Sequence, residues 1–516
     1  MPPSSPLHWL PLLAVPLLAV PLLLRALLRA PASEEPWSTR VDVPLALAAG
    51  LASALLAGLW LTRFSFRDYP LTASDFEQYC QGVDLLRRGE SAGWPAQRSV
   101  FAGVLAGWLA GPLGVMDALV VNAFASMALA GATSYLWARS VGGRLAGVCA
   151  ALGLGAVAPV AALTRTVTFY PTTVAGLLLA SAGATAAMRW RTAPALAVAG
   201  TGAGVALLVD ARGLVWALPA VGIALVAAIL GPSSTSRGRA LPLRLLALAT
   251  PLALSWAAGP WAYPEGAVTL ENQVAIWAQD ALRLSGTEGR VPRTPAGFIW
   301  GRSDPRDIPG TLLWLAALPG RLPAVLASNA DVERLRHTTV GPWMAPLAVS
   351  AMLVVAVHAR RRPLAVLALA GTALPFLIAL RGATEVLGHP RHVATALAFV
   401  PVLFGLAYEG LVTRRGASSS PAAPPAATAA RASSPSPRGD GLRVLVGTGA
   451  FVLLLLGVIP SWLSPVAGWR VRRGAESEPA AMLEALGGAG MADPRCIAAL
   501  RRDLADGKGP RLFVGE

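Results

Sequence analysis

Two carboxylates that could do chemistry, Asp75 and Glu77, stand two residues apart in the stretch 74–79, which we predict to be a polar loop between apolar segments. A carboxylate held near a hydroxyl or amine can act as a general base, and burial against a membrane face adjusts its pKa. Tyr79 adds a hydroxyl to the same stretch. The alternative is an ordinary polar loop whose acids are simply solvated.

Three arginines are candidates for binding a phosphate group. Arg165 is a lone cation before an apolar segment, where it either binds phosphate oxygens or reaches up to lipid headgroups. Arg212 follows Asp210 at the junction of two apolar segments, where ionisable residues are costly and are either functional or locally ion-paired. Arg391 offers a planar, permanently charged fork that suits phosphate oxygens.

The spacing Glu385-x3-His389-x2-His392 suggests a metal site at first sight. Gly388 and Pro390 interrupt the helix that would align these side chains, so we predict no metal there. The sequence contains no glycine-rich phosphate loop and no soluble nucleotide-binding domain. Direct use of a nucleotide is therefore disfavoured, and we predict no cofactor.

The composition indicates a membrane protein. Of 516 residues, 54% are apolar and 14% are charged, and apolar runs of about 17 to 22 residues recur along the chain. The net charge of +15 comes from short arginine clusters between these runs, which favours a topology signal over nucleic-acid binding. Richness in Ala, Gly, Pro and Arg is typical of a GC-rich bacterial genome, so we expect the bacterial inner membrane. The predicted segments are 7–24, 43–62, 118–138, 145–162, 171–188, 193–209, 213–231, 243–258, 341–358, 363–380, 393–411 and 443–462.

Charge orients these segments. Four turns hold ten arginines and no acid: 139–144, 189–191, 232–244 and 359–362. The positive-inside rule places them in the cytoplasm, and Asp42 and Glu409 are among the few acids expected on that face. Alternation then places four loops outside: 163–170, 210–212, 259–340 and 381–392.

The apolar run 99–116 decides on which side Asp75 lies. If this run spans the membrane, Asp75 is cytoplasmic; if it lies flat beside the membrane, Asp75 shares the outer face with the other acidic loops. Three glycines and Pro112 make it a poor uninterrupted helix. We therefore predict a flat element and an outward-facing Asp75.

The chain divides into a membrane core with short additions. The predicted parts are an extra N-terminal helix and turn (1–42), a core (43–411) with outer loops 63–117 and 259–340, a linker (412–442), a last helix (443–462) and an outer tail (463–516). The linker is rich in Ser, Ala and Pro and should be disordered. The tail is too small for a catalytic domain.

The three cysteines, Cys80, Cys149 and Cys496, have no metal-like spacing, and their odd number predicts no disulfide framework. A bridge between Cys80 and Cys496 requires both to lie outside the cell.

The order of short motifs resembles the membrane-embedded glycosyltransferases of the C-type fold, the superfamily of protein O-mannosyltransferases and bacterial lipid A aminoarabinose transferases. The resemblance covers roughly residues 43–411. Its motifs in order are Asp75-x3-Tyr79, Tyr135-Leu136-x-Ala138-Arg139-x3-Gly143, Asp210-x-Arg212-Gly213 and Pro390-Arg391-His392. The chain departs from the family where Phe76 separates the two acids and where a histidine follows Arg391.

This resemblance implies an all-α polytopic fold with about 11–13 transmembrane helices and juxtamembrane helices in its outer loops. It also implies inverting transfer of a sugar from a polyprenyl-phosphate donor to a glycolipid, polysaccharide or protein acceptor of the cell envelope, on the outer face and without an essential metal. Asp75 would be the base, with Glu77 orienting the acceptor or sharing that role. The implied phosphate-binding residues are Arg165, Arg212 and Arg391, and the supporting residues are Tyr79, Asp210, His389 and His392.

Two alternatives stay open. A transporter or lipid flippase commonly has about twelve helices, although no two halves of matching pattern are visible here. A non-catalytic membrane protein with the same fold is the other alternative. The oligomeric state is open as well.

Overall fold

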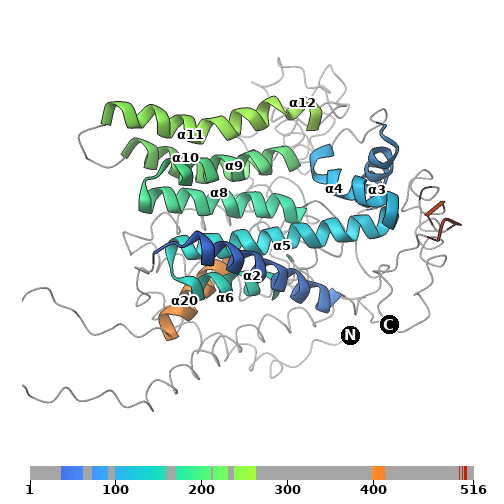
Figure 1. Ribbon diagram of the computed structural model, residues 1–516, viewed down its shortest axis with the longest axis horizontal. Helices are drawn as coiled ribbons and strands as arrows, with labels where there is room; N and C mark the ends of the chain where they lie inside the picture. The colour runs from blue at the N-terminus through green and yellow to red at the C-terminus, as the bar shows by residue number, and fades with distance from the viewer. Residues whose placement is uncertain are drawn as a thin grey trace, which may run out of the picture.

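The structure is a computed structural model, and it describes residues 36–61, 73–90, 99–156, 160, 170–210, 213–230, 237–262, 398–412, 499, 502–503 and 505–507. In this part of the chain the secondary structure is helical, and the helices form a bundle with largely aligned axes (Figure 1). The helices are α2 (Thr39–Leu61), α3 (Ala73–Arg88), α4 (Val100–Leu113), α5 (Val115–Val141), α6 (Arg144–Ala156), α8 (Tyr170–Trp190), α9 (Ala193–Val209), α10 (Gly213–Leu230), α11 (Arg237–Ala257), α12 (Gly259–Ala262) and α20 (Val400–Val412).

Each predicted apolar segment that the structure describes contains a helix. The bounds of α9 agree with the predicted segment 193–209, and those of α8 and α10 differ from prediction by at most two residues. Three described helices are long and apolar enough to cross a membrane, within Thr39–Ala57, Asp117–Val141 and Tyr170–Trp190, and shorter apolar helices pack beside them. The fold is therefore the all-α membrane class. The predicted segments 7–24, 341–358, 363–380 and 443–462 lie outside the described residues.

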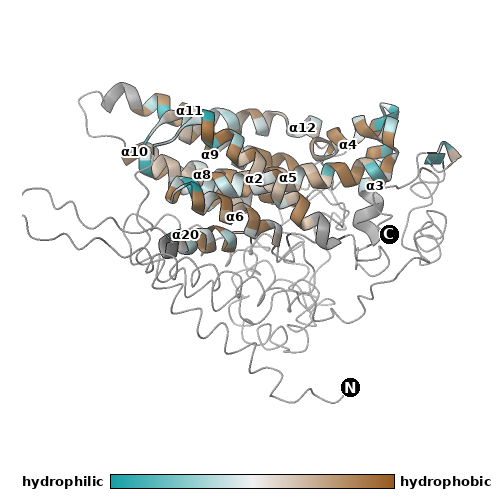
Figure 2. Ribbon diagram, turned by 60° about the horizontal axis from the view of Figure 1, so that its bottom comes forward, coloured by the Kyte–Doolittle hydropathy of each residue, from teal (hydrophilic) through white to brown (hydrophobic). Residues whose placement is uncertain are grey.

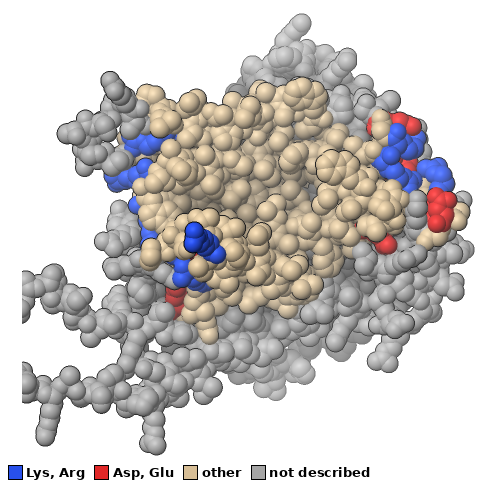
Figure 3. Space-filling view, in the orientation of Figure 1, with Lys and Arg blue, Asp and Glu red and all other residues tan. Residues whose placement is uncertain are grey.

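The bundle has two ends of different character. At one, which we call the Arg139 end, α5 and α8 finish side by side, because the Arg189 Nη1 donates to the Ser140 carbonyl at 3.1 Å. The Arg191 Nη1 donates to the Leu230 carbonyl at 3.3 Å, which brings the last residue of α10 to the same end. We call the opposite end the α3 end. Figure 3 shows mostly basic side chains toward the left of the view, with a small acidic area below them, and mixed acidic and basic side chains at the right.

Small residues let the central helices pack closely. A Cβ added at Gly176 of α8 would lie 2.8 Å from the Ala206 nitrogen of α9, and one at Gly183 would collide with the backbone at Ala199. Such backbone proximity is characteristic of helices that associate within a bilayer, where van der Waals contact drives packing. Figure 2 shows apolar residues along these helices and hydrophilic residues on α3.

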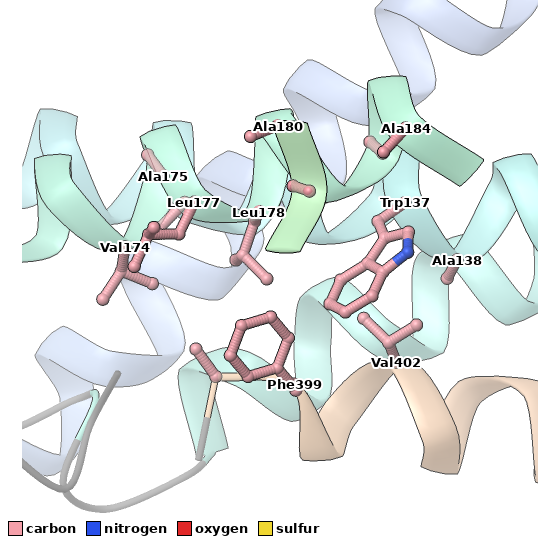
Figure 4. Close-up of a cluster of buried hydrophobic side chains, with 14 of the residues drawn as sticks. Trp137, Ala138, Val174, Ala175, Leu177, Leu178, Ala180, Ala184, Phe399 and Val402 are labelled. Carbon is pink, nitrogen blue, oxygen red and sulfur yellow. The ribbon is translucent and has the colours of Figure 1, made fainter. Parts of the chain in front are cut away.

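Larger side chains join α20 to the centre of the bundle. The Trp137 ring of α5 meets the Phe399 ring edge-on, with ring centroids 5.1 Å apart (Figure 4). Outside the bundle, Leu47 and Leu51 of α2 are 63% and 57% exposed, as expected of side chains that face lipid in a membrane-spanning helix.

Candidate functional site

The stretch that carries Asp75 and Glu77 is helical, so the prediction of a polar loop here is wrong. Both residues lie in the first two turns of α3, and their side chains are outside the described part of the structure. The helix is amphipathic, and Tyr79 and Val83, one turn apart, are 3% and 0% exposed. This four-residue spacing of apolar residues is the sequence signal from which the helix could have been predicted.

Both ends of α4 lie at the α3 end of the bundle. At its start, the Ser99 hydroxyl donates to the Leu208 carbonyl near the end of α9 and accepts from the Phe101 nitrogen at 3.1 Å. At its finish, Gly114 alone separates α4 from the start of α5. With 14 residues α4 is about 21 Å long, shorter than a hydrocarbon core of about 30 Å. This is the arrangement that a flat, non-spanning segment 99–116 requires.

A glycine in α4 lets α3 pack closely on it. A Cβ added at Gly107 would lie 2.6 Å from the Leu86 Cβ of α3, so a side chain here would push the two helices apart. The glycines that weaken residues 99–116 as an uninterrupted helix therefore include one with a packing role. The consequence is that α3 rests directly on α4 and keeps a defined position across the end of the bundle.

The start of α5 forms the other support of this end. With 27 residues α5 is about 40 Å long, so about 10 Å of it exceeds the hydrocarbon core. The Asn122 Nδ2 donates to the Ala102 carbonyl of α4 at 3.3 Å, and both Asn122 and Asp117 are buried. The first turns of α5 therefore place buried polar side chains at the α3 end of the bundle, where Asn122 contacts α4.

Asp210 also lies at the α3 end, where it closes α9. Its nitrogen donates to the Ala206 carbonyl at 3.0 Å, and its own carbonyl accepts from the Gly213 nitrogen at 2.7 Å, so α9 passes almost directly into α10. A Cβ at Gly213 would collide with the Ala206 carbonyl, which explains the glycine in this tight connection.

The predicted site residues that the structure describes are thus on elements that meet at one end. Asp75, Glu77 and Tyr79 belong to α3, and Asp210 ends α9, which contacts α4 through Ser99. Five predicted residues lie outside the described residues: Arg165, Arg212, His389, Arg391 and His392. Among the residues that are described, no group of three or more His, Cys, Asp or Glu could hold a metal ion.

An ion-pair cluster on α3 was not predicted from the sequence. The Arg87 Nη2 pairs with the Asp84 Oδ1 at 2.5 Å, and the Arg87 Nη1 pairs with the Asp503 carboxylate. Burial alone would lower the pKa of Arg87, but these two carboxylates raise the pKa above its usual value, so the guanidinium stays charged. The spacing of Asp84 and Arg87 could have indicated their pairing on a helix, whereas nothing local pointed to Asp503.

The Arg139 end is held by a different buried cluster. The Asp42 Oδ1 accepts from the Arg139 Nε at 3.0 Å, from the Arg144 Nε at 3.1 Å and from the Tyr135 hydroxyl at 3.0 Å. Asp42 and Arg139 are fully buried. The motif Tyr135-x3-Arg139, on which the family resemblance partly rests, therefore joins α5 to α2.

The rest of that motif joins the same turn to α20. The Glu409 Oε2 accepts from the Gly143 nitrogen at 2.8 Å, and a Cβ added at Gly142 would lie 2.7 Å from the same oxygen. The two acids expected on the cytoplasmic face, Asp42 and Glu409, are therefore both at the Arg139 end. Their contacts are structural and hold four helices together.

The cysteines are in different states. Cys80 of α3 is disulfide-bonded and fully buried, whereas Cys149 of α6 is a free, buried thiol. Cys496, for which the sequence allowed a bridge to Cys80 only if both lie outside the cell, lies outside the described residues.

The comparisons with known proteins give similar structures but no sequence family. No protein-family model matches the chain, and no curated protein sequence matches it. The apo oligosaccharyltransferase of Archaeoglobus fulgidus is similar over 87% of this chain, with 15% identity and a TM-score of 0.48. AglB of the same organism, in complex with an inhibitory peptide and a dolichol-phosphate, is similar over 92%, with 14% identity and a TM-score of 0.42.

A third similar structure is ArnT from Cupriavidus metallidurans bound to undecaprenyl phosphate, with 16% identity and a TM-score of 0.30; the match covers 72% of this chain and 77% of that one. The chain spans 58% and 60% of the two archaeal structures. Because identities are this low and every TM-score is below 0.5, no residue role is transferred from these structures.

Proposed function

We propose that the chain is an integral membrane glycosyltransferase that moves a sugar from a polyprenyl-phosphate donor to a cell-envelope acceptor at the α3 end. The observation that carries the proposal is the position of α3. This helix bears Asp75 and Glu77 and rests on α4 across the end of a membrane bundle. A base on a helix that is fixed at the membrane surface can meet an acceptor beside the sugar of a lipid-linked donor.

The proposed chemistry needs a base and fixed cations. Asp75 takes the proton of the acceptor hydroxyl or amine as that atom attacks the anomeric carbon of the sugar. The bond from this carbon to the phosphate oxygen breaks, the configuration inverts, and polyprenyl phosphate leaves. Arg165, Arg212 and Arg391 balance the charge on the departing phosphate, an electrostatic task for which permanently charged guanidinium groups are suited. Such a leaving group requires no metal.

The other predicted site residues have supporting roles. Glu77 orients the acceptor or shares the proton with Asp75. Tyr79 is only 3% exposed, so its contribution is to anchor α3 rather than to contact substrate. Asp210, His389 and His392 would shape the polar rim, and an apolar groove would hold the prenyl chain.

Two features support an outer-face location for this end in a bacterial inner membrane. The acid-free arginine turns that the structure describes lie at the opposite end of the bundle, which the positive-inside rule assigns to the cytoplasm. The disulfide at Cys80 of α3 fits an oxidising compartment.

The test of this proposal is Asp75→Asn in membranes that contain equal amounts of each variant protein. We expect transfer of labelled sugar from polyprenyl phosphate to fall by about a hundredfold or more, because a general base typically contributes that much. Glu90→Gln is the matched control, since this carboxylate follows α3, is 49% exposed and pairs with Arg88 at 2.8 Å. Undiminished transfer by Asp75→Asn would end the assignment of Asp75 as the base.

A further inference from the structure

The C-terminal part of the chain lies on the α3 end. Ala499 is fully buried and Asp503 is 2% exposed, so these residues occupy a packed position and are not a solvated tail. Removing a carboxylate from water is costly unless partners replace the lost hydration, so the partners of Asp503 identify what this segment binds.

Asp503 caps the longest described helix from far away in the sequence. Its Oδ2 accepts from the Val115 nitrogen at 2.7 Å, a bond between residues 388 positions apart. The first N–H groups of a helix have no partner within the helix, and Gly114 offers no side chain to supply one. A carboxylate at this place also interacts favourably with the helix dipole.

The other oxygen of Asp503 holds α3. Its Oδ1 pairs with the Arg87 Nη1, and Arg87 in turn pairs with Asp84. The Arg502 Nη2 lies 3.2 Å from the Asp84 Oδ2, which adds a second contact between the C-terminal segment and α3. Asp503, Arg87, Asp84 and Arg502 thus alternate in charge across the interface, and each of the two buried carboxylates has a cationic partner.

The disulfide engages the same face of α3. Cys80 precedes Asp84 by four residues, a spacing that brings both side chains to one side of a helix, and Arg87 continues this side. Cys80 is fully buried and disulfide-bonded. One face of α3 is therefore held by a covalent bond and by ion pairs, in addition to its packing on α4.

We propose that Ala499, Arg502 and Asp503, together with the disulfide of Cys80, form a C-terminal clasp that holds α3 against the start of α5 and so positions the part of α3 that carries Asp75 and Glu77. Asp503 and Arg87 are positioning residues in this arrangement. The contact itself does not depend on any activity, but its consequence for catalysis rests on the proposed glycosyl transfer.

Hydrogen exchange of the full chain in lipid nanodiscs tests the contact. In Asp503→Ala we expect the backbone amides of α3 to exchange about tenfold faster or more, because Arg87 loses a buried partner. Arg502→Ala is the matched control: its side chain is 55% exposed, so loss of its surface ion pair should change exchange by less than about twofold. Unchanged exchange of α3 in Asp503→Ala would overturn the clasp.

Reduction of the disulfide is a second, independent test of the contact. A thiol reductant should accelerate exchange of α3 in the unmodified chain. In Cys80→Ser we expect exchange to be fast from the start, so the reductant should have no further effect. Exchange of α3 that does not respond to the reductant in the unmodified chain would show that the covalent part of the clasp is dispensable and would contradict the proposal.

The transfer assay tests the catalytic consequence. Asp503→Asn keeps an acceptor for the Val115 nitrogen but loses the charge that pairs with Arg87. We expect kcat to fall roughly tenfold to a hundredfold with the KM for the donor unchanged, since a displaced base slows the chemical step without weakening donor binding. Faster exchange of α3 with undiminished kcat would remove the positioning role. If the unmodified chain transfers no sugar, the proposed function fails, whereas the exchange measurements decide the clasp by themselves.

Discussion

The Arg139 end and the α3 end are both held by buried charge, but the partners come from different parts of the chain. At the Arg139 end, Asp42 and Glu409 bind the turn between α5 and α6, so the bundle helices satisfy one another. At the α3 end, the ion pairs join a surface helix to a C-terminal segment. The Arg139 end is therefore stabilised by contacts among the bundle helices themselves. The α3 end is stabilised by elements that pack onto the bundle.

This difference between the Arg139 end and the α3 end is consistent with a membrane enzyme of the proposed kind. A bundle with one internally closed end provides a rigid base, while added elements at the other end can carry reactive side chains and admit a substrate. Binding and catalytic residues commonly lie on connecting segments that a rigid scaffold positions. Three changes test this comparison.

The two ends should lie on opposite sides of the membrane. This predicts the largest difference between them, because labelling from outside should reach one end and not the other. Single cysteines at Glu90, just after α3, and at Thr192, before α9, would be placed in a Cys149→Ser background; both positions are exposed. A membrane-impermeant maleimide added to intact spheroplasts should label position 90 and leave position 192 unlabelled until the membrane is broken. Labelling of position 192 in intact cells would reverse the assigned orientation.

Loss of the central carboxylate should damage the Arg139 end severely. Asp42→Ala leaves Arg139 buried without its main ionic partner, so we expect a loss of about 3–5 kcal/mol in stability. Thermal unfolding of purified protein in detergent measures this change. Arg144→Gln is the control, because its side chain is 29% exposed and its removal leaves the pair of Asp42 and Arg139 in place. An Asp42→Ala variant as stable as the unmodified chain would refute a structural role for the cluster.

The smallest expected effect is a difference in stability between two N-cap substitutions, one at each end of the bundle. Ser99→Ala removes the side-chain cap of α4 and its bond to the Leu208 carbonyl, which should cost about 1 kcal/mol. Thr192→Ala should cost little, because Thr192 occupies the N-cap of α9 without a side-chain capping bond. Chemical or thermal unfolding compares the two. Equal losses would mean that the Ser99 contacts do not stabilise the α3 end.

Much of the bundle could be predicted from hydropathy and charge. The helix α9 has its predicted bounds, and the arginine turns lie together at one end because each is flanked by apolar runs long enough to cross the bundle. The flat interpretation of residues 99–116 came from their glycines, which in the structure include Gly107 at the contact of α3 with α4. These signals depend on residues that are close together in the chain, so they can be recognised before the fold is known.

The candidate site was less predictable. Its acids were recognised by their chemistry, but α3 was taken for a loop because polar residues dominate its first turns. The four-residue spacing of Tyr79 and Val83 could have indicated the helix, but their burial, which shows which face of α3 is packed, is known only from the tertiary structure. The roles of Arg165, Arg212 and Arg391 stay predictions, since these residues lie outside the described residues.

The sequence by itself determined the membrane class, the bounds of α8, α9 and α10 to within two residues and the separation of the basic turns, because these follow from residues that are neighbours in the chain. Only the tertiary structure decided that Asp503 meets Arg87 across 416 residues, that it caps α5, and that Asp42 satisfies two arginines. Buried charges require partners, but the sequence does not identify them, because the partner is chosen by how the helices pack. That choice places α3, and with it Asp75 and Glu77, across the end of the bundle.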